Sequence, residues 1–188
     1  MRGRIGGATV VDSEAVLLVH RPGEPPAYAF PAADVGDVPH EPEPEAAGYV
    51  RVAWEAVDSW LEEDEVVLGH PRNPYHRVDC LRATRRLRVE ASGQVLVDTV
   101  DTVLVAETAL APRLYVSPQH VRVDLLVPSV TTSYCPYKGA ATYWSARVGD
   151  TLVEDVAWSY EEPLPESAPL RGHLSFYDDR LTVLAQLP

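Results

Sequence analysis

The 188-residue sequence is poor in several features that identify common classes of protein. Its two cysteines, Cys80 and Cys135, lie far apart in the chain, which argues against a disulfide framework and a cysteine-rich zinc site. No apolar run reaches the roughly 18 residues of a membrane-spanning helix, and the N-terminal residues lack the pattern of a signal peptide. We therefore expect a cytoplasmic protein with no membrane partner, no metal and no cofactor.

Basic side chains are scarce relative to acidic ones. The formal net charge is −12, and the chain contains no long basic block. The densest basic run, residues 82–88, has the alternating spacing of a solvent-facing strand. Because affinity for nucleic acid depends on basic side chains that displace phosphate counterions, no nucleic-acid partner is expected.

Lysine is almost absent. Lys138 is the only lysine, and every other basic side chain is an arginine. The lysine ammonium is a compact point charge whose pKa falls readily on burial, whereas a guanidinium stays charged and needs room for its planar fork. A lone lysine in an arginine-using chain therefore predicts a position that requires a primary amine or a slimmer side chain. If a site needs that amine, Lys138 should be partly buried; the alternative is an exposed lysine without a role.

Residues 131–144 surround this lysine and read Thr-Thr-Ser-Tyr-Cys-Pro-Tyr-Lys-Gly-Ala-Ala-Thr-Tyr-Trp. Cys135 is a second candidate for catalysis, because a nearby ammonium lowers the pKa of a thiol and increases its thiolate content. A free cysteine is equally suited to the core as a small apolar side chain. No base is close in sequence, although His120 or His173 could approach in space. Lys138 and Cys135 are the candidate catalytic residues.

Acidic and aromatic residues complete the candidate site. Glu107 ends an apolar strand and could pair with Lys138 or Arg113. Aromatic walls with a few polar tips are typical of small-molecule sites, although the same rings could form the core of a small β protein. Since neighbours on a strand point to opposite faces, Tyr143 and Trp144 cannot both face one cavity. The candidate ligand-binding residues are Glu107, Tyr115, Tyr137, Tyr143, Trp144, Trp158 and Tyr160.

A further polar cluster lies on the proline-containing loop of residues 70–79. Its two histidines, His70 and His76, could bind a metal together with Asp79. Hydrogen bonds between arginine and aspartate that pin two half-domains together are the more ordinary role of such a loop. We expect the structural role.

Period-two patterns and 17 prolines spread along the chain predict a mainly β protein with few short helices. Residues 58–65 are predicted as a helical turn, because acids fill its early positions. Residues 36–45, which contain three prolines, are predicted as a loop. Hairpins are predicted over 86–90 with 94–99 and over 143–148 with 151–155, the latter with Trp144, Ala146 and Val148 on the core face.

An internal repeat organises the chain. The run Gly-Ala-Thr-Val-Val-Asp-Ser from Gly7 matches Gly-Gln-Val-Leu-Val-Asp-Thr from Gly93, and a Tyr-x-x-Pro sequence follows each run. The repeat predicts two tandem copies: residues 1–70 as a degenerate first copy and residues 71–188 as a complete copy that carries the candidate site. Because each half is small, we expect the halves to share a core.

Four motifs in the second half resemble the signature of DUF427, a family of uncharacterised domains. They are Thr-x-Tyr-Cys-Pro-Tyr-Lys-Gly ending at Gly139, Ala-Thr-Tyr-Trp ending at Trp144, Ala-Trp-Ser-Tyr ending at Tyr160 and Gly-His-Leu-Ser-Phe-Tyr ending at Tyr177. The resemblance implies a small antiparallel β domain, tent-like or an open barrel, present here twice. The family also carries a nucleotidyltransferase-like label, but the chain has no glycine-rich phosphate loop and no carboxylate pair placed for two metals.

These patterns favour a protein that binds a small molecule in an aromatic pocket around the Cys-Pro-Tyr-Lys-Gly motif, with Lys138 and Glu107 as polar anchors. An enzyme that uses Lys138, Cys135 or both on a small metabolite is the first alternative. A protein-interaction module, in which the motif is only core, is the second. The deciding feature is whether Lys138 and Cys135 open on a cavity. Oligomeric state is unknown from the sequence.

Overall fold

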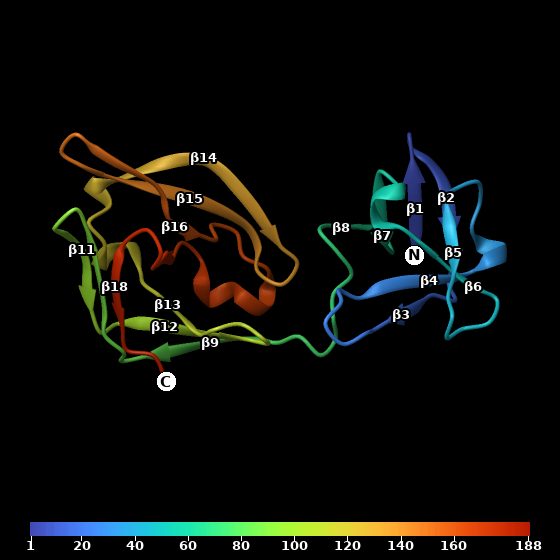
Figure 1. The fold of residues 1–188 in the computed structure, drawn as a ribbon, viewed down its shortest axis with the longest axis horizontal. Helices are drawn as coiled ribbons and strands as arrows, with labels where there is room; N and C mark the ends of the chain where they lie inside the picture. The colour runs from blue at the N-terminus through green and yellow to red at the C-terminus, as the bar shows by residue number, and fades with distance from the viewer. The chain divides into compact units, whose positions relative to one another are not determined.

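A computed structural model describes residues 1–188, and its regular structure is mainly antiparallel strands (Figure 1). The chain divides into two compact units, Met1–Pro74 and Tyr75–Pro188, which we call unit 1 and unit 2. The predicted mainly β class is confirmed, and the sheets are open. The helical segments are short 3-10 turns, none of which could span a bilayer: η1 Ala32–Asp34, η2 Trp54–Ala56, η3 Pro118–His120, η4 Val123–Leu125 and η5 Pro165–Leu170.

Unit 1 contains two four-stranded antiparallel sheets. Its apolar core includes the rings of Phe30 and Trp60, which stack with their centroids 5.5 Å apart. Gly3 permits this arrangement, because a Cβ there would lie 2.9 Å from the Trp60 ring. The first sheet has the strand order β2 (Ala8–Asp12), β1 (Arg2–Ile5), β7 (Ser59–Glu62) and β8 (Glu65–Val67). The second sheet has the order β3 (Leu17–Val19), β4 (Ala27–Pro31), β6 (Tyr49–Val52) and β5 (His40–Pro42).

Residues 58–65, predicted as a helical turn, form most of a β-hairpin instead. β7 pairs with β1, with Trp60 opposite Gly3, and the turn to β8 contains Glu63 at a positive φ of 50°. The prediction was wrong because acidic residues suit an exposed turn as well as a helix start. Burial of Trp60 and Leu61 against the sheet outweighs the local helix preference.

The segment 36–45, predicted as a loop, contains β5, which pairs with β6. Glu43 follows this strand with only 1% of its side chain exposed. Its carboxylate lies 2.7 Å from the Arg21 guanidinium and 3.1 Å from that of Arg51. A buried carboxylate held by two arginines anchors the segment, and this contact has no signal in the local sequence.

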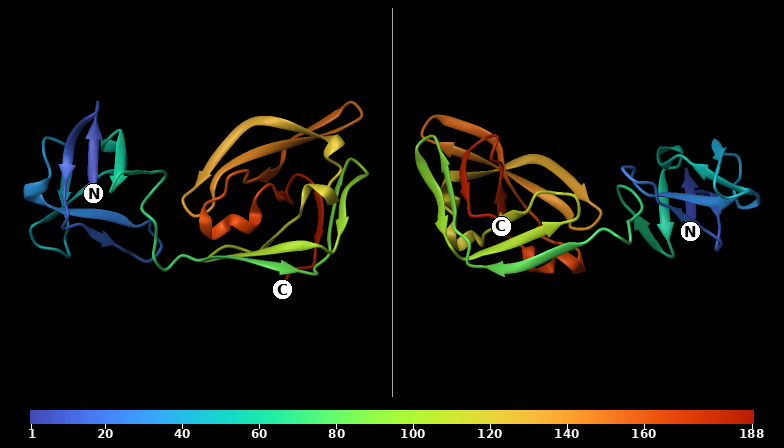
Figure 2. Two further views of the ribbon diagram at one scale, coloured as in Figure 1. Left: turned by 180° about the vertical axis from the view of Figure 1, so that it is seen from behind. Right: turned by 60° about the horizontal axis from the view of Figure 1, so that its bottom comes forward.

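Unit 2 contains three antiparallel sheets (Figure 2). Buried side chains from all three sheets form one large apolar cluster. Both predicted hairpins are confirmed, as β10 with β11 and β15 with β16. The first sheet has the strand order β11 (Gln94–Thr99), β10 (Leu87–Ala91) and β18 (Thr182–Ala185). The second has the order β13 (Arg113–Tyr115), β12 (Thr102–Glu107) and β9 (Val78–Ala83). The third has the order β14 (Leu126–Cys135), β15 (Gly139–Val148), β16 (Thr151–Ser159) and β17 (Leu174–Phe176).

Strand alternation divides the side chains of β15 between two apolar clusters of unit 2. Trp144, Ala146 and Val148 belong to or pack against the large cluster, which confirms their predicted core face. Ala141 and Tyr143 belong to or pack against a second, smaller cluster on the other face. The opposite directions predicted for Tyr143 and Trp144 are therefore also observed, and the smaller cluster is the one that borders the candidate site.

Strand pairings in unit 1 recur in unit 2 with residue numbers higher by 86. The recurrence covers the β1–β2 and β10–β11 ladders, including a register shift at the same point in each. It also covers the β3–β4 and β12–β13 ladders and one isolated bridge. The Gly3–Val11 pair corresponds to Val89–Val97. In the same way, Leu17–Ala29 corresponds to Val103–Tyr115, and the Val11–Val35 bridge corresponds to Val97–Val121.

Each apolar cluster draws its buried residues from one unit alone. The cluster around Phe30 lies within unit 1, and the two others lie within unit 2. This differs from the shared core expected from the small size of each half. Compact sheets that pack on themselves bury the large aromatic and branched side chains within each unit.

Candidate functional site

Unit 2 has a pocket of about 340 Å³ bordered by its smaller apolar cluster. A pocket of this size is at the lower end of the range that small organic ligands occupy. The lining combines aromatic rings with two basic side chains and one acidic side chain. The lining residues are Val105, Glu107, Leu110, Ala111, Arg113, Tyr115, Lys138, Tyr143, Trp158, Tyr160 and Tyr177.

Strand alternation explains how distant parts of the chain reach the same pocket. On β12, Val105 and Glu107 are two residues apart and share a face. On β13, Arg113 pairs directly opposite Val105, so its side chain lies beside theirs. Trp158 on β16 pairs opposite Tyr143 on β15. The pocket therefore lies between the β9–β12–β13 sheet and the β14–β17 sheet.

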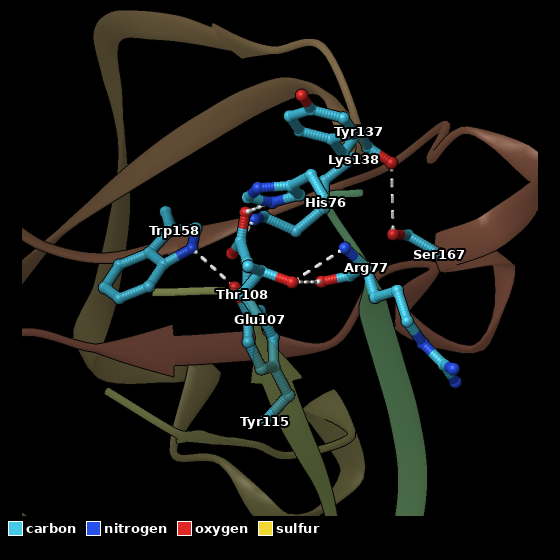
Figure 3. A network of polar contacts seen from close by, with 9 residues as sticks. All are labelled: His76, Arg77, Glu107, Thr108, Tyr115, Tyr137, Lys138, Trp158 and Ser167. Atoms are coloured by element: carbon cyan, nitrogen blue, oxygen red, sulfur yellow. Dashed lines mark hydrogen bonds and ion pairs between the residues drawn. The ribbon is translucent and has the colours of Figure 1, made fainter. Parts of the chain in front are cut away.

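Lys138 comes from the tight turn that joins β14 to β15. It is 7% exposed, which agrees with the burial expected of a lysine that serves a site. Its Nζ donates a hydrogen bond to Oε2 of Glu107 (Figure 3). Gly139 makes the turn possible: its φ is +100°, and a Cβ there would lie 3.3 Å from the carbonyl oxygen of Glu162.

His76 is the second partner of Glu107. Its Nε2 lies 3.0 Å from Oε1 of Glu107, and the side chains of the two residues are only 17% and 10% exposed. The imidazole stacks on the Tyr137 ring with centroids 3.9 Å apart and planes 16° apart. The Glu107 carboxylate is thus held between an imidazole and an ammonium (Figure 3).

Backbone contacts fix the chain beside this group. The Thr108 hydroxyl accepts a hydrogen bond from the Arg77 amide at 2.9 Å, and the Thr108 amide donates to the Arg77 carbonyl at 3.0 Å (Figure 3). Ser167 on η5 donates to the Tyr137 carbonyl at 3.3 Å. These bonds join the neighbours of His76, Glu107 and Lys138, so they help to hold the three side chains together in addition to the direct bonds among them.

Aromatic side chains form the walls of the pocket. Trp158 donates its Nε1–H to the Tyr115 hydroxyl at 2.9 Å and lies 4.5 Å, centroid to centroid, from the Tyr177 ring. Burial raises the pKa of Tyr115 and of Tyr160 above the ordinary range of a phenol. Burial, followed by the hydrogen bond with Tyr143, raises the pKa of Tyr177 to about 12. These hydroxyls are therefore neutral hydrogen-bonding groups at physiological pH.

Six of the nine candidate site residues predicted from the sequence line the pocket, and three do not. Trp144 points to the opposite face and donates its Nε1–H to Ser159 at 2.9 Å. Tyr137 stacks on His76 outside the lining. Cys135 packs against the smaller apolar cluster as a half-buried thiol. The pocket residues are Lys138, Glu107, Tyr115, Tyr143, Trp158 and Tyr160.

Three residues of the site, His76, Arg113 and Tyr177, are absent from the set predicted from the sequence. The sequence pattern places His76 in the 70–79 loop, for which a structural role is predicted. Its partner Glu107 is 31 residues away, so no local spacing connects them. In the same loop Arg77 pairs with Asp79 at 2.8 Å. No group of three or more His, Cys, Asp or Glu side chains is placed to hold a metal ion.

Chemically, the arrangement can bind and orient a small polar molecule. The Glu107 carboxylate, the Lys138 ammonium and the His76 imidazole form a hydrogen-bonded chain through which protons can be exchanged. The phenols and the indole supply apolar walls. Cys80 is less suited to reaction, because burial raises the pKa of its thiol despite the nearby Lys138 ammonium.

Residues 79–186 match a family model described as a domain of unknown function, DUF427. The match covers the sheets of unit 2, including the Lys138 turn and Glu107, and begins just after His76. No curated protein shows significant similarity to the chain.

Proposed function

The chain belongs to the DUF427 family, and from the geometry of unit 2 we propose that it binds a small organic molecule in the 340 Å³ pocket. In this proposal Lys138 and Glu107 are the polar anchors, and the rings of Tyr143, Trp158 and Tyr160 are the walls. The single observation that carries the proposal is a buried ion pair opening on a ligand-sized pocket.

The energetics of buried ion pairs support a role in binding. Taking an ammonium and a carboxylate out of water has a desolvation penalty of several kcal/mol per ion, which their mutual attraction offsets only in part. Apolar residues of similar size would stabilise the fold as well or better. Lys138 and Glu107 side chains are 8% and 10% exposed and lie among aromatic rings. Such a pair at a pocket is a candidate functional site on physical grounds.

A thermal-shift screen of the full chain against a metabolite library tests this proposal. A ligand at about a hundred times its dissociation constant adds roughly 2.7 kcal/mol of stability. The shift should disappear in Lys138→Met, when each variant is compared with its own ligand-free melting temperature. Arg147→Met, which removes an exposed cation from the same strand pair, is the matched control and should keep the shift. Hits that stabilise Lys138→Met as much as wild type would contradict the proposal.

A second candidate function is an enzyme in which Lys138 moves a proton on the bound molecule. The observation that favours it is the continuous line from His76 through Glu107 to Lys138, because such a line can return a proton to the reacting group. Cys135 contributes less to this alternative, since it does not line the pocket. Mass spectrometry of each hit incubated with wild type or Glu107→Gln would detect a product formed only by wild type.

We also propose that the two units are tandem copies of one domain. The support is the recurrence of strand registers 86 residues apart. By the same offset, Arg21 occupies the position of Glu107 and pairs with Glu43 instead of a lysine. Ligand binding is therefore assigned to unit 2 alone. An experimental structure in which the β1–β2 and β10–β11 registers differ would contradict common descent.

A further inference from the structure

We infer that the ligand of the pocket is a flat organic anion whose acidic group binds Arg113. The inference rests on the proposed binding function and adds the chemical class of the ligand. It depends on three features of the pocket: the charges that line it, the hydrogen bonds that the Arg113 guanidinium leaves unused, and the shape of the aromatic walls.

The lining of the pocket has one more positive charge than negative. Its ionised side chains are Glu107, Lys138 and Arg113. Lys138 is paired with Glu107, so the two charges largely cancel within the protein. Arg113 is left as the surplus cation, in a chain whose formal net charge is −12. A local positive charge favours an anionic ligand at this pocket, even though the protein as a whole is acidic.

The Arg113 guanidinium is weakly engaged within the protein. Its Nη1 lies 3.5 Å from the Phe176 carbonyl oxygen and 3.9 Å from the Asp178 carboxylate, which is 71% exposed. No other hydrogen bond from this side chain is formed, although a guanidinium has five N–H donors. Its carbon Cζ lies 5.3 Å from the Trp158 ring centroid, and this contact orients the planar group. An oriented guanidinium with unused parallel donors is suited to a carboxylate or phosphate.

The walls suit a flat molecule with a second polar group. The Trp158 and Tyr177 rings lie together at one side of the pocket, with Tyr143 stacked beyond Tyr177 at 6.4 Å. Tyr160 also lines the pocket and is 5% exposed. Its hydroxyl is both a donor and an acceptor, so it can bond a second polar group of the ligand.

Three phenols of similar size, whose para substituents are anionic, neutral and cationic, test the inference: 4-hydroxybenzoate, 4-hydroxybenzyl alcohol and 4-hydroxybenzylamine. Each is titrated into the full chain, and the signals of the pocket tyrosines and tryptophan are followed by NMR. The acid should bind at least about tenfold more tightly than the alcohol, because only the acid forms a charged hydrogen-bonded pair with Arg113. The amine should bind most weakly of the three.

Arg113→Met should remove the preference for the acid and leave the affinity for the alcohol within about twofold. Arg180→Met is the matched control, because the Arg180 guanidinium lies 5.1 Å from the Tyr177 ring centroid but does not line the pocket. It should keep the preference. If Arg113→Met does not fold, Arg113→Lys substitutes for it and should weaken binding of the acid through loss of the bidentate contact.

The outcomes separate the two proposals. Binding of the alcohol or the amine as tight as that of the acid, or a preference that survives Arg113→Met, overturns the anion inference and leaves the binding function standing. A failure of all three probes to perturb the pocket signals at millimolar concentration also overturns the anion inference, and the metabolite screen with Lys138→Met then decides the binding function separately.

Discussion

The two members of the Lys138–Glu107 pair should contribute unequally to the stability of unit 2. Glu107→Gln leaves the Lys138 ammonium, whose side chain is 8% exposed, without a carboxylate. Lys138→Met leaves the Glu107 carboxylate still bonded to His76 at 3.0 Å. Removing one partner of a buried pair costs about 3–5 kcal/mol. We therefore expect a loss of about 3 kcal/mol for Glu107→Gln and about 1–2 kcal/mol for Lys138→Met, because His76 remains as a partner.

Urea unfolding of the full chain at neutral pH measures these differences, provided that the slope with denaturant is unchanged. The double variant Lys138→Met with Glu107→Gln removes both charges and should be no less stable than Glu107→Gln alone. The resulting coupling energy should be about 1–2 kcal/mol. Arg147→Met, at an exposed position, should lie within about 0.5 kcal/mol of wild type.

Three results would refute this reasoning. Equal losses for the two single variants would mean that His76 does not share the carboxylate. Losses below about 0.5 kcal/mol for both would mean that the pair is solvated in solution and behaves like a surface salt bridge. Additive effects in the double variant would mean that the two side chains do not interact at all.

Further predictions concern the Lys138 turn, the phenols and the independence of unit 2. Gly139→Ala should lower the free energy of unfolding by about 2 kcal/mol in chemical unfolding, because φ is +100° and the new Cβ lies 3.3 Å from a carbonyl oxygen. The control Gly149→Ala, at φ +57° with no atom near the new Cβ, should lower it by about 1 kcal/mol, and equal losses would contradict the steric argument. The pKa of Tyr177 is raised from 10.0 to about 12, so the stability that this phenol contributes is fully present below pH 10 and is lost as the pH rises through 12; ultraviolet titration showing that all tyrosines ionise near pH 10 in the folded chain would contradict this. Tyr75–Pro188 expressed alone should melt in one cooperative calorimetric transition, because its apolar clusters are its own, and an aggregated or non-cooperative product would show otherwise.

Much of unit 2 was predictable from local pattern. The alternation that placed Trp144, Ala146 and Val148 on one face is a property of the strand itself, and it held because one face of the sheet is buried. The Gly149 hairpin and the hairpin across Gly93 were predictable for the same reason, since turn residues lie between two alternating runs. Composition singled out Lys138 through the contrast with the arginines, and burial was expected only if a site needs its amine; the side chain is buried.

Local pattern failed where a long-range contact decided the outcome. Residues 58–65 carried acids suited to a helix start, yet pairing of β7 with β1 made them a hairpin. Trp144 and Tyr137 were plausible wall residues by type, but one faces the opposite side of the sheet and the other stacks on an imidazole. Residue type indicates which side chains suit a site, and it does not indicate which of them meet.

By itself, the sequence determined the β class, the hairpins and the family of unit 2, and it singled out Lys138 as the only lysine. These follow from periodicity, turn residues, motif and composition, all of which act over a few neighbouring residues. Only the tertiary structure decided that Glu107 is the partner of Lys138 and that His76 is the second partner of Glu107. Each of those contacts spans 31 residues. They form because strand register and the backbone bonds between Arg77 and Thr108 bring three separate segments together, and no local interaction encodes that meeting.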